Sequence, residues 1–442
     1  MIRIANGSAC WGDWLEAPVR LIEQGPIDYL TLNYGRGAGT ALEPQQADPE
    51  LGYACEFPPL MARMARQIRE RGVRVAAAAG GANAVACARE IRRLAPSLSV
   101  SAVVGGNILG RLDALLADGH ELRNLDTGEP LAAIRSRVLS ADIIESAFPL
   151  AEALGTGAGV AIAGCADNTS LALAAAIHHF GWKPEDYSLL AAGAAAGHLI
   201  GGGAQLTAGG DQSDCESIPD PAHIGYPIAE MEPDGCFTVT KHKAAGGRVQ
   251  MDLVKERLLS ETGDPRWFFT PDCSADFTAL RMESAGADRV RICGSRGGPP
   301  PGDWRVLIRY RYGWKAVGTL VCCWPRAVEK ARAADAVLRE RLRDLDLELE
   351  AVHSELAGVN ACHQHLARPA ADPPEVLLRI GVRARDRGAV ERFARELTPL
   401  ALCGLPGLAG LADGYPRVRE ITAPWYALLP RREAPLHVEV IE

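Results

Sequence analysis

The stretch from Gly157 to Trp182 constrains the fold of this chain more than any other. Val160 to Ala163 is an apolar run that is too short for a helix and typical of a buried parallel strand. Gly164 ends this run, and the polar residues Asp167 to Ser170, each able to cap a helix, precede an alanine-rich helical pattern. A strand, a polar elbow and a helix in this order form an α/β unit, which gathers ligands at the carboxyl end of its strand.

The same succession recurs along the N-terminal part of the chain. Short apolar runs predict six strands, at Ile2–Ala5, Tyr29–Leu32, Val73–Ala79, Leu98–Val104, Val138–Ile143 and Val160–Ala163. Helical patterns lie between most of them, and this alternation predicts a mostly parallel sheet with flanking helices. An open sheet and an incomplete barrel both fit, and we favour the open sheet because the pattern stops short of eight units.

The C-terminal part has a different pattern. Val306–Arg311 and Trp314–Val321 predict a pair of strands, and two strand–helix–strand halves follow from there. These halves predict a smaller α+β domain of the split-βαβ, ferredoxin-like kind. The stiff run Gly298–Gly302 contains three prolines and marks the expected boundary. We therefore expect an α/β domain over 1–298, with a hairpin and basic loop at 225–250, and an α+β domain over 303–442.

Composition excludes several classes of partner. The 442 residues carry a formal net charge of −8, so no general attraction to nucleic acid or to an anionic membrane is expected. No apolar run reaches the roughly 18 uncharged residues of a membrane helix. The twelve cysteines form no CxxC pair and are expected to be reduced, which favours a cytoplasmic location. A homo-oligomer is expected because symmetric dimers are the commonest enzyme assembly.

Four of the predicted strands end in glycine with an asparagine or aspartate nearby. Ordinary turns also favour these residues, so each elbow alone has a structural explanation. Because parallel strands bring their carboxyl ends to one edge, the set together predicts a ligand site there. The side chains expected to bind substrate at this edge are Asn6, Ser8, Trp11, Asn33, Asn83, Asn107, Asp167 and Asn168.

Two residues are candidates for moving a proton. Asp13 lies between two tryptophans, and a partly apolar pocket would raise its pKa; the alternative is that it caps the next helix. His242 lies between Lys241 and Lys243, whose charges disfavour the imidazolium form.

The same basic loop is a candidate anion site. Its two lysines, with the amides of Gly246 and Gly247, could hold a carboxylate or the phosphates of coenzyme A. A solvated basic loop is the alternative to both roles.

Other signals are weaker. Cys10 as a nucleophile would need an adjacent base that the sequence does not identify. Cys362, His363 and His365 lack a second half with zinc spacing, so no metal site is predicted. No glycine elbow matches GxGxxG or GxxxxGK[ST], and neither a dinucleotide cofactor nor a P-loop is expected.

A series of ordered motifs resembles a known family. NGSACWGD, SLALAAAIHHFGW, AAGHLIGGGAQLTAGG, GYPIAEMEPDG, TKHKAAGGRV, GDPRWFFTPDCSADF and DRVRICGSRGGPPP are similar to the acyclic terpene utilisation protein AtuA family, from about Arg3 to Pro430. The resemblance implies a part in the bacterial breakdown of citronellol and geraniol, where the substrates are branched acyl-CoA esters. Lyase or hydratase chemistry is what the resemblance suggests.

We therefore expect a cytoplasmic lyase or hydratase/dehydratase that acts on a small branched carboxylic acid or its CoA thioester. Coenzyme A would enter only as part of the substrate, and no other cofactor is expected. Two alternatives stay open: a non-catalytic ligand-binding or scaffold subunit of a metabolic complex, and a metal-dependent hydrolase.

Overall fold

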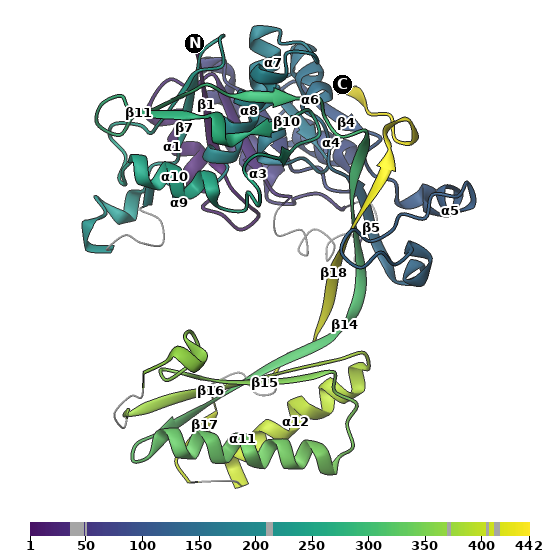
Figure 1. Cartoon of the computed structure of the whole chain (residues 1–442), viewed down its shortest axis with the longest axis vertical. Coiled ribbons are helices and arrows are strands. Elements are labelled where there is room, and N and C mark those ends of the chain that lie inside the picture. The colour runs from purple at the N-terminus through teal and green to yellow at the C-terminus, as the bar shows by residue number, and fades with distance from the viewer. Residues whose placement is uncertain (36–47, 49–50, 209–214, 369–372, 404–405, 411–415) are drawn as a thin grey trace. The chain divides into compact units, whose positions relative to one another are not determined.

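The chain folds into two compact units in the computed structural model, which describes residues 1–35, 48, 51–208, 215–368, 373–403, 406–410 and 416–442. Unit 1 consists of Met1–Arg135, Leu139–Ile308 and Trp425–Glu442, and unit 2 of Ser136–Val138 and Arg309–Pro424 (Figure 1).

This division differs from the expected domains in two places. The strand β14 (Asp303–Cys323) continues past the proline run, so the unit boundary falls within this strand, after Ile308. The chain end belongs to unit 1 because β19 (His437–Ile441) pairs with β4 (Val100–Val104).

A mixed ten-stranded sheet forms the centre of unit 1, in the order β11-β12-β8-β7-β1-β2-β3-β6-β4-β19. Five neighbouring strands are parallel: β1 (Ile2–Ser8), β2 (Tyr29–Asn33), β3 (Arg74–Ala78), β6 (Val160–Ala163) and β4. The others pair antiparallel: β7 (Ile228–Met231), β8 (Phe237–Thr240), β12 (Val290–Cys293), β11 (Arg281–Ser284) and β19.

The prediction of a mostly parallel sheet is therefore wrong beyond its centre. The turn at Pro233–Gly235 joins β7 directly to β8, and a tight connection of this length permits only antiparallel pairing. The predicted strand Val138–Ile143 forms as β5, but it pairs with β14 and not with the parallel strands.

Helices cover both faces of the parallel strands. One core contains side chains of α1 (Glu16–Gln24), α3 (Phe57–Arg71) and α4 (Ala84–Leu94). The other contains side chains of α6 (Ala147–Gly155), α7 (Asn168–Phe180) and α8 (Tyr187–Ile200). α7 and α8 are buried along most of their length, and their alanines and glycines let the two helices pack closely.

The remaining elements of unit 1 are shorter. They are α5 (Leu112–Ala117), α9 (Gln205–Ala208), α10 (Met251–Leu259) and a small sheet of β9 (Phe268–Phe269), β10 (Ser274–Asp276) and β13 (Arg296–Gly298).

The connections place a topological switch point between β3 and β6. β6 lies between β3 and β4, although it follows both in sequence. The chain leaves β3 for α4 on one face and leaves β6 for α7 on the other. Two neighbouring elbows that diverge in this way open a crevice at the carboxyl edge, which is where ligands bind in open α/β sheets.

Unit 2 follows a strand–helix–strand–strand–helix–strand order. Its elements are β14, α11 (Ala327–Asp344), β15 (Ala351–Ala357), β16 (Glu375–Ala384), α12 (Arg387–Cys403), β17 (Leu408–Gly410) and β18 (Arg419–Pro430). The sheet order is β15-β16-β14-β17 with antiparallel pairs, β18 also pairs with β14, and α11 and α12 contribute to one core with it.

The predicted pair of strands before and after Tyr312–Gly313 is a single strand. Gly313 does not make a turn: a Cβ there would lie 2.6 Å from the carbonyl oxygen of Ala384, so glycine serves the close approach of β16.

One disulfide joins Cys236 and Cys293, whose Cα atoms are 4.5 Å apart across β8 and β12. The expectation that all twelve cysteines are reduced is therefore wrong for these two. We predict that non-reducing peptide mapping, after alkylation of the unfolded chain, recovers the two cysteines in one linked peptide. Recovery of both in alkylated form would contradict the bond.

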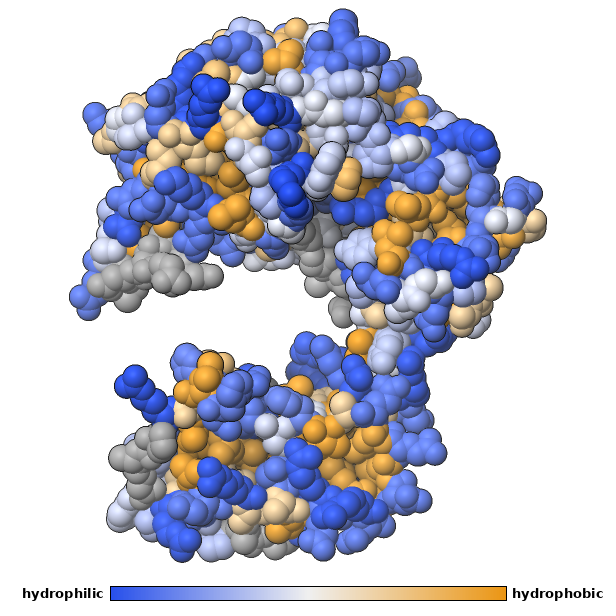
Figure 2. Space-filling view, viewed as in Figure 1, coloured by the Kyte–Doolittle hydropathy of each residue, from blue (hydrophilic) through white to orange (hydrophobic). Residues whose placement is uncertain are grey.

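Hydrophilic side chains cover most of the molecular face shown in Figure 2, and hydrophobic patches interrupt them on both units. Within the described residues, no helix has the length and apolar character needed to span a membrane.

Candidate functional site

The elbows after β3 and β6 touch each other at the switch point. The Gly80 N–H donates to the Ala163 carbonyl at 2.9 Å, and the Gly81 N–H donates to the Gly164 carbonyl at 3.0 Å. A Cβ on Gly164 would lie 2.7 Å from the Gly81 oxygen. The glycines therefore allow two backbones to meet where side chains would hold them apart.

Two helices begin at these elbows. Asn83 caps α4, because its Oδ1 accepts a hydrogen bond from the Ala86 N–H at 3.1 Å. Asp167 occupies the same position before α7 but makes no capping bond. Its Oδ2 instead accepts a hydrogen bond from Arg305 Nη2 at 3.1 Å. Among the described residues, the first-turn amides of α7 thus have no side-chain cap, and a half-exposed guanidinium lies beside them.

Glu145 places a buried carboxyl beneath the same elbow. The Gly164 N–H lies 3.2 Å from its Oε1 and 3.1 Å from its Oε2, and the Cys165 N–H lies 3.4 Å from Oε1. The residue is only 2% exposed. Burial raises the pKa of Glu145 to about 8, against the opposing effect of the two amides.

A second buried carboxyl, that of Asp272, bonds to the two residues that follow Glu145. Asp272 accepts hydrogen bonds from the hydroxyl of Ser146, the N-cap of α6, at 2.5 Å and from the Ala147 N–H at 3.0 Å, so it supports the start of α6 from a distant part of the chain. Burial raises the pKa of Asp272 to about 6. Its role at the helix start is structural.

Most of the predicted amide and hydroxyl residues lie at the carboxyl edge and bond locally. Ser8 Oγ donates to the Cys10 carbonyl at 3.0 Å after β1. Asn33 Oδ1 accepts from the Gly35 N–H at 2.8 Å after β2. Asn107 Nδ2 donates to Asp142 Oδ1 at 2.8 Å after β4.

Two predicted amides keep an acceptor atom without a partner. Asn6 is fully buried and donates from Nδ2 to Thr31 Oγ1 at 3.2 Å, while its Oδ1 has no partner among the described residues. Asn168 donates from Nδ2 to the Gly201 carbonyl at 3.2 Å, and its buried Oδ1 is equally unpartnered. Both could accept a hydrogen bond from a hydroxyl group or a water molecule.

Asp13 is held in its elbow by three donors. Its Oδ2 accepts from the Ala9 N–H at 2.8 Å, and its Oδ1 accepts from the Trp14 N–H at 2.7 Å and from the hydroxyl of Tyr226. It is not the residue that caps α1.

Asp13 also faces a small hollow. The hollow is too narrow for a water molecule, and Ser8, Tyr34 and Glu56 are among its other lining residues. Trp11, predicted to bind substrate, packs edge-on against Tyr34 with ring centroids 6.3 Å apart.

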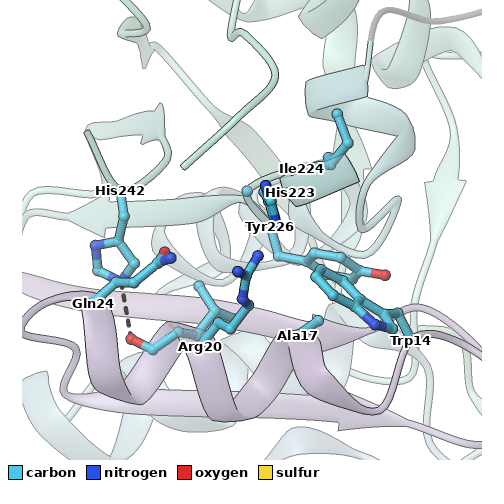
Figure 3. A pocket seen from close by; sticks show the side chains of 10 residues that line it. Trp14, Ala17, Arg20, Gln24, His223, Ile224, Tyr226 and His242 are labelled. Carbon is cyan, nitrogen blue, oxygen red and sulfur yellow. Dashed lines mark hydrogen bonds between the residues drawn. The ribbon is translucent and has the colours of Figure 1, made fainter. Parts of the chain in front are cut away.

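His242 lies at the other end of α1. Its Nε2 is 2.9 Å from the Leu21 carbonyl, the hydrogen bond drawn as a dashed line from His242 in Figure 3. Its ring lies against Gly25. Burial lowers the pKa of His242. Asp13 precedes the nine residues of α1, a length of about 13 Å at ~1.5 Å per residue, so the structure does not bring the two proton candidates together.

A pocket runs along α1 between Trp14 and His242 (Figure 3). It measures about 260 Å³, part of which is open solvent, and Arg20 and Tyr226 also line it.

Most polar groups of the basic loop are already bonded to other protein groups. Lys241 has a side chain only 3% exposed, and its Nζ lies 2.8 Å from the Ala245 carbonyl and 3.3 Å from Asp288 Oδ2. The Gly246 and Gly247 amides donate to the carbonyls of His223 and Pro219. Lys243 is exposed. The glycine amides are thus not available to an anion in this arrangement.

Glu145, Arg305 and Tyr226 are the site residues that sequence reasoning missed. Glu145 directly follows the apolar run of β5, and an acidic residue so close to a buried strand is a signal of a buried carboxyl. Arg305 and Tyr226 lie far from their partners in sequence, and no local pattern identifies them.

No cluster of three or more His, Cys, Asp or Glu side chains that could hold a metal occurs among the described residues. Cys362, His363 and His365 are exposed in unit 2.

Comparison with family models gives one match, described as acyclic terpene utilisation family protein AtuA, over residues 2–440. Comparison with curated proteins and with solved structures finds no match.

Proposed function

Because the chain belongs to the acyclic terpene utilisation family AtuA, we propose that it is a catabolic lyase or hydratase/dehydratase. Its substrate is a small branched carboxylic acid or the CoA thioester of such an acid. Coenzyme A takes part only as a portion of the substrate. A cytoplasmic location, a homo-oligomeric state and a ferredoxin-like class for unit 2 remain predictions, the last supported by its strand order.

The observation that carries the proposal is the start of α7 at the switch point. Helix amides without a side-chain cap attract an anion, and Arg305 beside them adds a positive charge. The anion is a carboxylate, or the oxyanion that develops on a thioester carbonyl when an enolate forms. Neither group needs a metal to be held at such amides.

Hydration adds a hydroxyl group to the β-carbon of an unsaturated acyl group and a proton to the α-carbon, and dehydration reverses both steps. One residue must therefore take a proton from water, and the site must hold the enolate oxygen. Asp13 is the better placed of the two predicted proton carriers, because it lies at the carboxyl edge with its carboxylate oriented by Tyr226. The unpartnered oxygens of Asn6 and Asn168 suit a substrate hydroxyl or the reacting water.

The test is incubation of the purified chain with a panel of branched unsaturated acids and their CoA thioesters, read by mass spectrometry. Gain or loss of one water, or cleavage into two fragments, supports the proposal. Binding without any change of mass would instead identify a non-catalytic ligand-binding subunit.

Replacement of Arg305 tests the anion site. Arg305→Gln is expected to raise the KM or Kd for the active acid by about tenfold, the effect of losing about 1.4 kcal/mol from a charged hydrogen bond. Arg63→Gln is the matched control, because Arg63 makes a comparable exposed ion pair with Glu16 on another surface. Equal effects of the two substitutions would remove Arg305 from the site.

A further inference from the structure

The side-chain carboxyl of Glu145 lies at the switch point, against two glycines. A Cβ on Gly106, after β4, would overlap its Oε1, and a Cβ on Gly164, after β6, would lie 2.9 Å from the same atom. The absence of a Cβ at these two elbows therefore leaves the space that this carboxyl fills. The backbone of Glu145 is fixed as well, because its N–H donates to the Cys165 carbonyl at 2.8 Å and its carbonyl accepts from Ser170 Oγ at 3.0 Å.

The Glu145 carboxyl accepts hydrogen bonds from two backbone N–H groups, and donors of this kind also stabilise an oxyanion. The Gly164 and Cys165 N–H groups are consecutive, lie at the end of β6, and come just before the uncapped start of α7. An anion bound at this start lies only a few residues along the chain from the Gly164 and Cys165 amides that contact Glu145. A negative charge at this start repels an ionised and buried Glu145, so neutralising one of the two stabilises the pair.

The charged groups around Glu145 do not supply that neutralisation. Asp142, on β5, is acidic and raises the Glu145 pKa further, and Asp272, beyond Ser146, is also acidic. Asp167 and Cys165 flank the elbow. Arg305 makes an ion pair with Asp167, whose negative charge offsets part of its positive charge, and Arg431 lies next to Asp272. The remaining way to neutralise the Glu145 carboxylate is to protonate it.

We propose that Glu145 is a second proton-exchanging carboxyl of this site, in addition to Asp13, and that it takes up one proton as an anionic substrate group binds at the start of α7. The proposal rests on the proposed function. The carboxylate gains one proton from solvent and becomes a carboxylic acid, and no other atom is exchanged. The protonated side chain then holds a proton beside the bound anion, where it can be returned to the substrate. Because burial already raises the Glu145 pKa to about 8, the carboxyl is mostly protonated at neutral pH, and the uptake on binding approaches one proton only above pH 8.

The proposal is tested by isothermal titration calorimetry of the full chain in two buffers of different ionisation enthalpy. The probes are 3-methylbut-2-enoate, its CoA thioester and free coenzyme A, which separate binding of a carboxylate from binding of a neutral thioester carbonyl and from binding of the coenzyme's phosphates. At about pH 9.5 the wild-type chain is expected to take up close to one proton per bound anion, and near pH 6 almost none. Its Kd should rise about tenfold per pH unit above pH 8.

Two variants identify the group. Glu145→Gln is expected to bind the same probe without proton uptake and with a Kd independent of pH. Asp272→Asn is the matched control, because it alters another buried carboxyl and should leave the uptake in place. The pH dependence of the wild-type Kd decides the question even where Glu145→Gln does not fold.

The outcomes separate the two proposals. A probe that binds the wild-type chain without proton uptake, or equal uptake by Glu145→Gln, overturns the role of Glu145 and leaves the proposed function standing. Failure of every probe to bind or to react overturns both.

Discussion

Replacement of Gly81 by alanine is expected to lower the free energy of unfolding by about 4 kcal/mol. Gly81 has a φ of +51°, which costs an L-residue about 1 to 2 kcal/mol. A Cβ there would also overlap the Gly52 carbonyl oxygen, which is fixed by the Ala82 N–H at 2.8 Å. Because that obstacle is backbone, relief requires the elbow of β3 and the chain at Gly52 to move apart.

Gly72→Ala is the matched control. Gly72 ends α3 with a φ of +66°, but nothing lies within 4 Å of the position of a Cβ. It should lose only the conformational term, about 1 kcal/mol. Urea unfolding of both variants followed by circular dichroism measures the difference. Equal losses would show that the close approach of Gly81 to the Gly52 carbonyl contributes nothing to stability.

The central part of the fold could be predicted from the sequence because it is encoded locally. Each parallel strand is a short apolar run, and each glycine elbow ends one, so the pattern places the elbows at one edge without knowledge of the strand order. Asn83 was predicted to bind substrate, and in the structure its side chain caps α4.

The rest depends on contacts between distant parts of the chain. β5 has the same apolar composition as its neighbours, yet it pairs with β14, and nothing within Val138–Ile143 encodes that partner. β19 returns to unit 1 by pairing with β4 from the far end of the chain. The proline run at Gly298–Gly302 indicated a boundary because prolines break local structure, but a strand can begin directly after such a run.

In the candidate site, too, the local pattern predicts some features, and contacts between distant residues determine the others. The elbows of Asn33, Asn107 and Asn168 were found from their residue types. Their bonding partners were not, and these decide which atoms stay available. Asn33 and Asn107 are occupied by neighbouring groups, whereas Asn168 keeps a free acceptor.

The stability of the wild-type chain is expected to fall more steeply than that of Glu145→Gln as pH rises from about 4.5 to 8. The carboxyl of Glu145 has a pKa of 4.5 in the unfolded chain and about 8 in the folded one. Between these values the folded chain keeps a proton that the unfolded chain releases, so stability decreases with pH by at most about 1.4 kcal/mol per unit. Below 4.5 the contribution is complete, and above 8 the loss is complete. Glutamine does not titrate, so the variant lacks this slope.

The difference between the two curves isolates Glu145 from other titrating groups. His178 and His242 have lowered pKa values, so each makes stability rise with pH near 6.5, but both variants share them. Asp272→Asn supplies a second comparison, because the Asp272 pKa rises only from 3.8 to about 6. It should flatten the curve below pH 6 and leave the slope between 6 and 8 unchanged, whereas Glu145→Gln removes that upper slope. Urea midpoints measured across this pH range decide it: a slope between pH 6 and 8 that persists in Glu145→Gln would assign the titration to another group.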